Sequence, residues 1–244
     1  TAIEGDVWYN SSTGKLKMYA SAGSWATGNN ANGASLRQAG FGIQTAAVKV
    51  GGNAPGVNCE LYDGSSWTEV NNLQTGRMYL SGAGTTAAGL AFGADPGPGN
   101  GQLSEEFDGT NWAEGNDLNA VSLLSMGVGT QTAALSCGSG PGGAEDKVEE
   151  YNGTSWTEIA DMNTARSTGG ATGKGTTTDC LTFGGWKAPS TTTTGLTEAF
   201  NGTSWTEVAD MGTARYYNGG AGTSTTSALT FGGLDPGVAN TENY

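Results

Sequence analysis

Four segments of the chain share one pattern: LYDGSSWTEV (61–70), EFDGTNWAEG (106–115), EYNGTSWTEI (150–159) and AFNGTSWTEV (199–208). Their tryptophans, Trp67, Trp112, Trp156 and Trp205, are 45, 44 and 49 residues apart, and an aromatic residue precedes each by five positions. A degenerate copy, MYASAGSWATG (18–28), places Trp25 42 residues before Trp67. Self-similarity at this period predicts a repeat architecture in which each unit buries its apolar faces against its neighbours.

The turn chemistry inside each unit predicts short antiparallel strands. Asp-Gly or Asn-Gly between the aromatic residue and the tryptophan is a strong hairpin signal, because both central residues of a tight turn need positive φ. This predicts strand, turn and strand over 58–70, 104–115, 147–159 and 196–208. The Gly-, Ala- and Thr-rich half of each unit, for example GAGTTAAGLAFG (82–93), predicts a second hairpin, and no segment has the 3.6-residue apolar period of a helix.

Four short strands in each repeated unit are typical of an all-β protein built as a β-propeller of four-stranded blades. We predict the propeller over 15–244, after a hairpin or linker segment over 1–14 of a longer chain. Five blades follow if the N-terminal hairpin 15–28 pairs with the last inner hairpin 215–233 and closes the ring. Six or more follow if TENY (241–244) begins another blade. The recurring Trp and Tyr/Phe pairs are expected to pack between blades.

The repeat resembles the kelch motif. A Gly-Gly pair ends the second strand of a unit, and an aromatic residue, a tryptophan and an arginine-bearing loop follow. The pairs are Gly51-Gly52, Gly184-Gly185 and Gly232-Gly233. The resemblance covers the chain from about residue 15 and implies a kelch-like β-propeller. Because one such fold serves many activities, the resemblance does not identify a function.

Composition excludes several functions. The chain has 10 Lys+Arg against 23 Asp+Glu, and a net charge of −13 repels the phosphate backbone of nucleic acids. The absence of histidine removes His-based catalytic triads and His-ligated metals. No apolar run reaches 18 residues, so membrane insertion is not expected. Cys59, Cys137 and Cys180 are odd in number without CxxC spacing, and we expect them to be small buried packing residues.

No cofactor is expected, and the sequence nominates no catalytic acid–base pair. Carboxylates in the loops leave a calcium site open as an alternative: Asp95, Glu145, Asp146 and Asp235. Asn10, Asn152 and Asn201 match the N-glycosylation pattern, but the last two coincide with the hairpin turn. We therefore interpret Asn152 and Asn201 as turn residues.

The candidate ligand-binding residues lie in the loops after the second and fourth strands, which share one face of a propeller. Trp186 and Lys187 stand in one such loop, where an exposed indole can stack on a sugar ring, and Tyr216 and Tyr217 are further candidates. Four loop arginines complete the set, with Ser122 at the third copy: Arg37, Arg77, Arg166 and Arg215.

The arginines allow two interpretations. They predict an anion- or glycan-binding ring near the axis, or ion pairs with the repeated glutamates. These glutamates are Glu60, Glu105, Glu149, Glu198 and Glu242. We favour the ion pairs, because a pair that recurs in every unit is explained more simply by packing between units.

Two segments resemble bacteriophage proteins. GDVWYNSSTGKLKMY (5–19) resembles a short hairpin of tail-fibre and virion structural proteins, and NGTSWTEIADMNTAR (152–166) resembles repeats of marine and cyanobacterial phage virion proteins. The resemblance implies a non-enzymatic protein of the virion, outside the cell. Its partners would be a host-surface glycan or receptor and other virion proteins, with homo-oligomers left open. The alternative is a secreted or cell-surface bacterial propeller that acts as a protein-interaction scaffold. An enzyme such as a polysaccharide depolymerase is the least favoured hypothesis.

Overall fold

The protein is described here from a computed structural model. It covers residues 28–53, 56–94, 100–140, 145–188, 192–234 and 240–244, together with the backbone of two short strands over 7–10 and 15–18. Within these ranges the chain is all-β, with one short 3₁₀ segment at Asn100–Gln102 and no α-helix. The described part of the chain contains no helix with the length and apolar character needed to cross a bilayer.

Five antiparallel sheets follow one another along the chain, and the strands of each sheet are ordered as in the sequence. The first sheet contains β3 (Ala39–Ile43), β4 (Ala46–Val50), β5 (Cys59–Tyr62) and β6 (Trp67–Val70). The second contains β7 (Ser81–Gly84), β8 (Gly89–Phe92), β9 (Ser104–Phe107) and β10 (Trp112–Glu114). The third contains β11 (Met126–Thr130), β12 (Ala133–Ser139), β13 (Glu145–Tyr151) and β14 (Trp156–Glu158).

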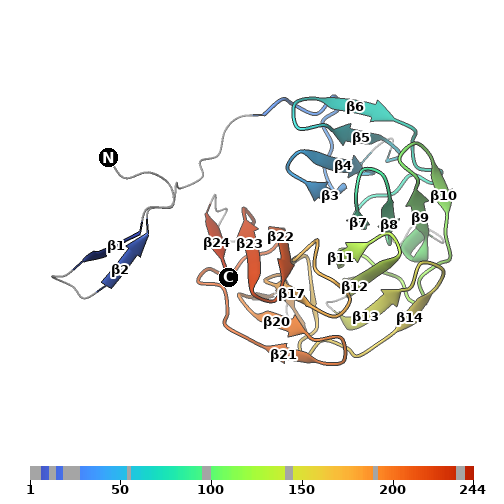
Figure 1. The fold of residues 1–244 in the computed structure, drawn as a ribbon. Helices are drawn as coiled ribbons and strands as arrows, with labels where there is room; N and C mark the ends of the chain where they lie inside the picture. Colours follow the sequence, from blue (N-terminus) through green and yellow to red (C-terminus); the bar gives the residue numbers. More distant parts are fainter. Residues whose placement is uncertain are drawn as a thin grey trace.

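The fourth sheet contains β16 (Gly170–Ala171), β17 (Cys180–Phe183), β20 (Thr197–Phe200) and β21 (Trp205–Glu207). The fifth contains β22 (Gly219–Ser224), β23 (Ser227–Phe231) and β24 (Thr241–Asn243). Figure 1 shows the sheets along an arc, with first strands such as β3, β7 and β11 toward the middle and last strands such as β6, β10 and β14 outside. First strands of consecutive sheets contact one another, from β3 to β22. Two hairpins per unit are thus confirmed for the first four sheets.

An additional small sheet joins the segments on either side of the fourth sheet's inner hairpin. It contains β15 (Arg166–Ser167), β18 (Trp186–Lys187) and β19 (Thr192–Thr193). The sequence predicts a loop over 186–196, but β18 pairs with both β15 and β19. Trp186 is therefore held by backbone pairing on both sides.

The predicted closure by the N-terminal hairpin is wrong for residues 15–18. β1 (Val7–Asn10) and β2 (Lys15–Met18) pair with each other, and the free side of β23 is taken by β24. Residues 241–244 therefore complete the fifth sheet up to its third strand and begin no further sheet. β24 has the same position in its repeat as the third strands of the other sheets, which are β5, β9, β13 and β20. It therefore pairs with β23 as those strands pair with the second strands of their sheets. Residues 19–27, which include Trp25, lie outside the described residues.

The outer turns differ from the predicted tight turn. Tyr62 pairs directly with Trp67, so four residues connect the strands, and only Gly64 has positive φ, at 93°. The Asp63 side chain stabilises this wider turn. Its Oδ1 accepts hydrogen bonds from the backbone N–H groups of Ser65 at 2.8 Å and Ser66 at 2.7 Å. Asn152 and Asn201 make the same turn, which confirms their role as turn residues.

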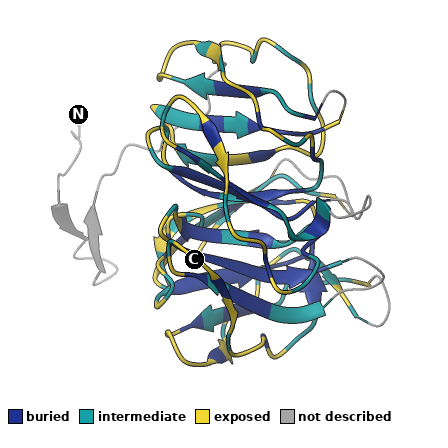
Figure 2. Ribbon diagram, turned by 90° about the vertical axis from the view of Figure 1, so that its right-hand side faces the viewer, coloured by how far each residue is buried: buried dark blue, intermediate teal, exposed yellow. Residues whose placement is uncertain are grey.

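The core lies between consecutive sheets. Trp112 and Phe107 of the second sheet pack against Val48 and Val50 of the first. The four outer hairpins repeat this arrangement, with ring centroids 4.8–5.1 Å apart in the cross-strand pairs Tyr62–Trp67, Phe107–Trp112, Tyr151–Trp156 and Phe200–Trp205. Figure 2 shows the buried residues on the strands and many of the exposed ones at turns and outer edges. The predicted packing of the aromatic pairs between units is confirmed for the last three of these pairs.

The three cysteines are buried and free, as predicted. Cys59 belongs to the core between the first two sheets, and Cys137 and Cys180 belong to the core around the third and fourth. Burial raises the pKa of the Cys59 thiol to about 11. These thiols are therefore neutral packing groups at physiological pH.

Candidate functional site

Three of the four candidate arginines are buried in ion pairs. Arg77 Nη2 lies 3.1 Å from Glu105 Oε1, Arg166 Nη2 lies 3.1 Å from Glu198 Oε1, and Arg215 pairs with Glu242. The three arginines are at most 3 % exposed. The interpretation as ion pairs is confirmed for them, and no surface ligand can reach their guanidinium groups.

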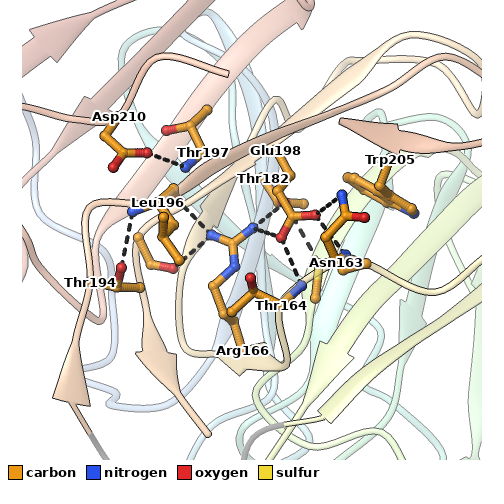
Figure 3. A network of polar contacts seen from close by, with 12 residues as sticks. Asn163, Thr164, Arg166, Thr182, Thr194, Leu196, Thr197, Glu198, Trp205 and Asp210 are labelled. Atoms are coloured by element: carbon orange, nitrogen blue, oxygen red, sulfur yellow. Dashed lines mark hydrogen bonds and ion pairs between the residues drawn. The ribbon is translucent and has the colours of Figure 1, made fainter. Parts of the chain in front are cut away.

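The Arg166 pair shows why these groups tolerate burial (Figure 3). Arg166 Nη1 donates to the carbonyl oxygens of Gly184 at 3.1 Å and Leu196 at 2.8 Å, which ties the loop after β17 to the start of β20. Glu198 accepts the backbone N–H of Asn163 at 2.7 Å and of Thr164 at 3.2 Å, from the loop after β14. Burial lowers the pKa of Arg166, and the Glu198 carboxylate opposes this shift. The pair therefore joins consecutive sheets.

Arg37 occupies a different position in its repeat. The residue in register with Arg77 is Ser35, whose Oγ donates to the Gly51 carbonyl, as Arg77 does to that of Gly93. In the first sheet Lys49 supplies the cation instead, 2.5 Å from Glu60. Around Glu149 of the third sheet, backbone and amide N–H groups of Asn119 and Ala120 act as donors, and the described part of the chain gives it no ion pair.

Arg37 belongs to a set of five residues with a left-handed backbone, one before each first strand. The set, called here the left-handed ring, is Arg37, Tyr79, Leu124, Thr168 and Tyr217, with φ between 52° and 66°. Four hydrogen bonds of 2.7–3.1 Å link each N–H to the carbonyl of the preceding member. These residues are 42, 45, 44 and 49 apart, the same intervals as the tryptophans. Non-glycine residues rarely adopt this conformation, which costs about 1 kcal/mol or more each, so the links between sheets must hold it.

Three candidate aromatic residues meet at Tyr217, the last member of the left-handed ring. The ring centroids of Trp186 and Tyr216 are 4.6 Å apart, those of Tyr216 and Tyr217 are 5.2 Å apart, and those of Trp186 and Tyr217 are 5.7 Å apart. Trp186 and Tyr216 are half-buried, and Tyr217 is 43 % exposed. We call these three residues the aromatic platform. The sequence separates Trp186 from Tyr216 by 30 residues. The pairing of Trp186 with Ser167 and the hydrogen bond from the Tyr217 N–H to the Thr168 carbonyl bring them together.

Arg37 is on the same end of the molecule as the platform, because Arg37 and Tyr217 each precede the first strand of a sheet. Its guanidinium is 4.7 Å from the centroid of the Tyr79 ring, and its Nη1 is 3.6 Å from Met78 Sδ. Burial and the neighbouring Tyr79 and Tyr216 raise the pKa of Tyr217, whereas the Arg37 charge opposes the shift.

Two further exposed apolar residues are on the same end of the molecule. Leu36, next to Arg37, is 69 % exposed, and Leu234, which bridges to Tyr216, is 46 % exposed. Sequence reasoning missed these two residues and Tyr79. Alignment of the repeats on their tryptophans would have found Tyr79, because it stands in register with Tyr217.

The exposed rings and the exposed guanidinium define what this end of the molecule can contact. The described residues contain no cluster of three or more acidic, cysteine or histidine side chains that could hold a metal ion. Asp95 and Asp235, two of the four candidate calcium ligands, lie outside the described residues. Rings with exposed faces beside an exposed guanidinium can stack on a flat apolar surface and bind a polar group at its edge.

Comparison with known proteins adds no assignment. No family model matches the chain, and no curated protein matches it significantly.

Proposed function

We propose that the five sheets are the blades of a kelch-like β-propeller. Three observations support the proposal: the common strand order, the cores between consecutive sheets, and the left-handed ring. The ring places one residue before the first strand of every sheet, at the same intervals as the tryptophans. Gly184 and Gly185, with φ of 70° and 100°, make the sharp exit from the second strand that the kelch resemblance implies.

A fourth strand of the fifth blade would lie beside β24, the last strand of that sheet among the described residues. In every sheet the first strand begins 14 residues after a tryptophan, and Trp25 stands 14 residues before β3. A pocket beside β24 is lined by Phe183, Ala209 and Tyr244 among others. Ala209 is in register with Ala160, whose carbonyl accepts the indole N–H of Trp205 at 3.0 Å. The pocket therefore has the position that a tryptophan occupies beside the preceding sheet.

The function that the geometry supports best is non-enzymatic attachment to a surface glycan. The aromatic platform carries this proposal, because exposed rings held by a rigid scaffold bury the apolar faces of sugars at little conformational cost. The phage resemblance of residues 5–19 supports a virion appendage, such as a tail fibre, as the setting. The rival function is a protein-interaction scaffold, which the exposed Leu36 and Leu234 favour.

Replacing Trp186 by Ala tests the attachment proposal. We expect binding to host-surface polysaccharide to weaken at least tenfold, measured by glycan array and calorimetry, because the platform loses its largest ring. The unfolding temperature should change little, since Trp186 is only half-buried. Ile43→Ala is the matched control, because Ile43 is 48 % exposed at the end of β3, next to the turn at the opposite end of the first sheet.

Three results would count against this function. An equal loss of binding in both variants would mean that the platform is not the site. Loss of thermal stability without loss of binding would make Trp186 a packing residue. Capture of a protein partner by the same face, without glycan binding, would favour the scaffold.

A further inference from the structure

We propose that the glycan bound at the platform is acidic, and that Arg37 binds its carboxylate while the platform stacks on the sugar ring. This inference rests on the proposed glycan-binding function and names the class of sugar.

Arg37 has no carboxylate partner among the described residues. Of the eight lysines and arginines whose side chains the structure describes, five are in ion pairs: Lys49, Arg77, Lys147, Arg166 and Arg215. Arg37 is exposed, and within the described part of the chain it forms no ion pair. In a protein with 23 carboxylates and 10 cations, an arginine that contacts only a thioether and a phenol ring is available for an external anion.

The position of Arg37 is fixed. Its backbone has φ of 66°, and its carbonyl accepts the N–H of Tyr79 at 2.8 Å, so the residue is tied to the second sheet. The face of the Tyr79 ring orients the guanidinium and leaves its planar fork free for a carboxylate. A guanidinium already held in place loses less entropy when it binds a ligand.

The net negative charge does not oppose this assignment. At 0.15 M salt the Debye length is about 8 Å, so carboxylates farther away are largely screened. The affinity for a carboxylate in direct contact with Arg37 depends mainly on that contact. A charge-assisted hydrogen bond contributes more to binding than a neutral one.

The experiment compares two ligands and two variants of the full chain. The ligands are an oligogalacturonide and its methyl ester, which differ only in the charge of the carboxyl groups. Arg37→Gln removes the proposed contact. Lys174→Gln is the matched control, since Lys174 is exposed and precedes β17, whereas Trp186 follows that strand at its other end.

We expect Arg37→Gln to weaken binding of the charged oligosaccharide about tenfold or more, and to leave the ester unaffected. Lys174→Gln should alter neither. Equal binding of charged and esterified ligand by the wild-type protein would overturn the acidic assignment and leave glycan binding intact. A sulfated oligosaccharide is tested in parallel. If the protein binds none of the three ligands, both proposals are overturned. Preference for the sulfated ligand, lost in Arg37→Gln, would keep the anion contact but reject the carboxylate.

Discussion

At the scale of single residues, the same arginine chemistry has two different outcomes in this protein. Arg166 is fully buried, and its charge is used within the molecule, by Glu198 and by the carbonyl groups of Gly184 and Leu196. Arg37 stands two positions later in its repeat and faces solvent. A difference of two positions in the repeat therefore decides whether the arginine is buried between sheets or exposed to solvent.

Removing a buried arginine should be costly. In Arg166→Met, Glu198 stays buried without its cation, and we expect a loss of about 3–5 kcal/mol in the free energy of unfolding, measured with urea. Lys147→Met is the control, because Lys147 and Glu158 are 43 % and 53 % exposed and such pairs contribute at most about 1 kcal/mol. Similar small losses in both variants would show that the Arg166 pair does not stabilise the protein.

At the scale of elements, the four-residue outer turns show how one side chain sets a local structure. Hydrogen bonds from the backbone N–H groups of Ser66 and Ser65 lower the pKa of Asp63 from 3.8 to about 2. Because the folded pKa is the lower one, this stabilisation is present above pH 4 and is lost as the pH falls toward 2. Asn152 and Asn201 keep the same acceptor without a charge.

Asp63→Asn should therefore remove part of the acid sensitivity. We expect an unfolding temperature close to that of the wild type at pH 7, because the amide oxygen still accepts both N–H groups. Between pH 4 and pH 2 the variant should lose less stability than the wild type, as followed by circular dichroism. The reverse change, Asn152→Asp, should add acid sensitivity. Identical pH profiles for all three proteins would contradict the role given to the Asp63 charge.

At the scale of the whole molecule, the fifth sheet differs from the other four, because it has three described strands. β24 leaves one edge unpaired within the described residues, and the pocket beside it repeats the surroundings of a tryptophan. A sheet edge of this kind pairs readily with any available strand. A further strand at this edge would protect it and bring the fifth sheet to four strands.

Hydrogen exchange at the Asn243 amide tests whether a further strand covers this edge. The N–H of Tyr244 donates to Ala228, so the alternating pattern directs the Asn243 amide away from β23. We expect slow exchange at Asn243, as for an amide paired with a neighbouring strand, and fast exchange would show that the edge stays open.

The sequence by itself determined the repeat, its two hairpins and the buried aromatic pairs, because turn residues and periodic tryptophans act locally and recur at fixed intervals. It also indicated the arginine–glutamate pairs, since both partners repeat together. The tertiary structure alone decided that Arg37 departs from those pairs, that residues 186–187 form a strand, and that Trp186 meets Tyr216 and Tyr217. Those outcomes depend on contacts between segments that are far apart in the chain. No local sequence pattern encodes such contacts, because they form only when the sheets pack together.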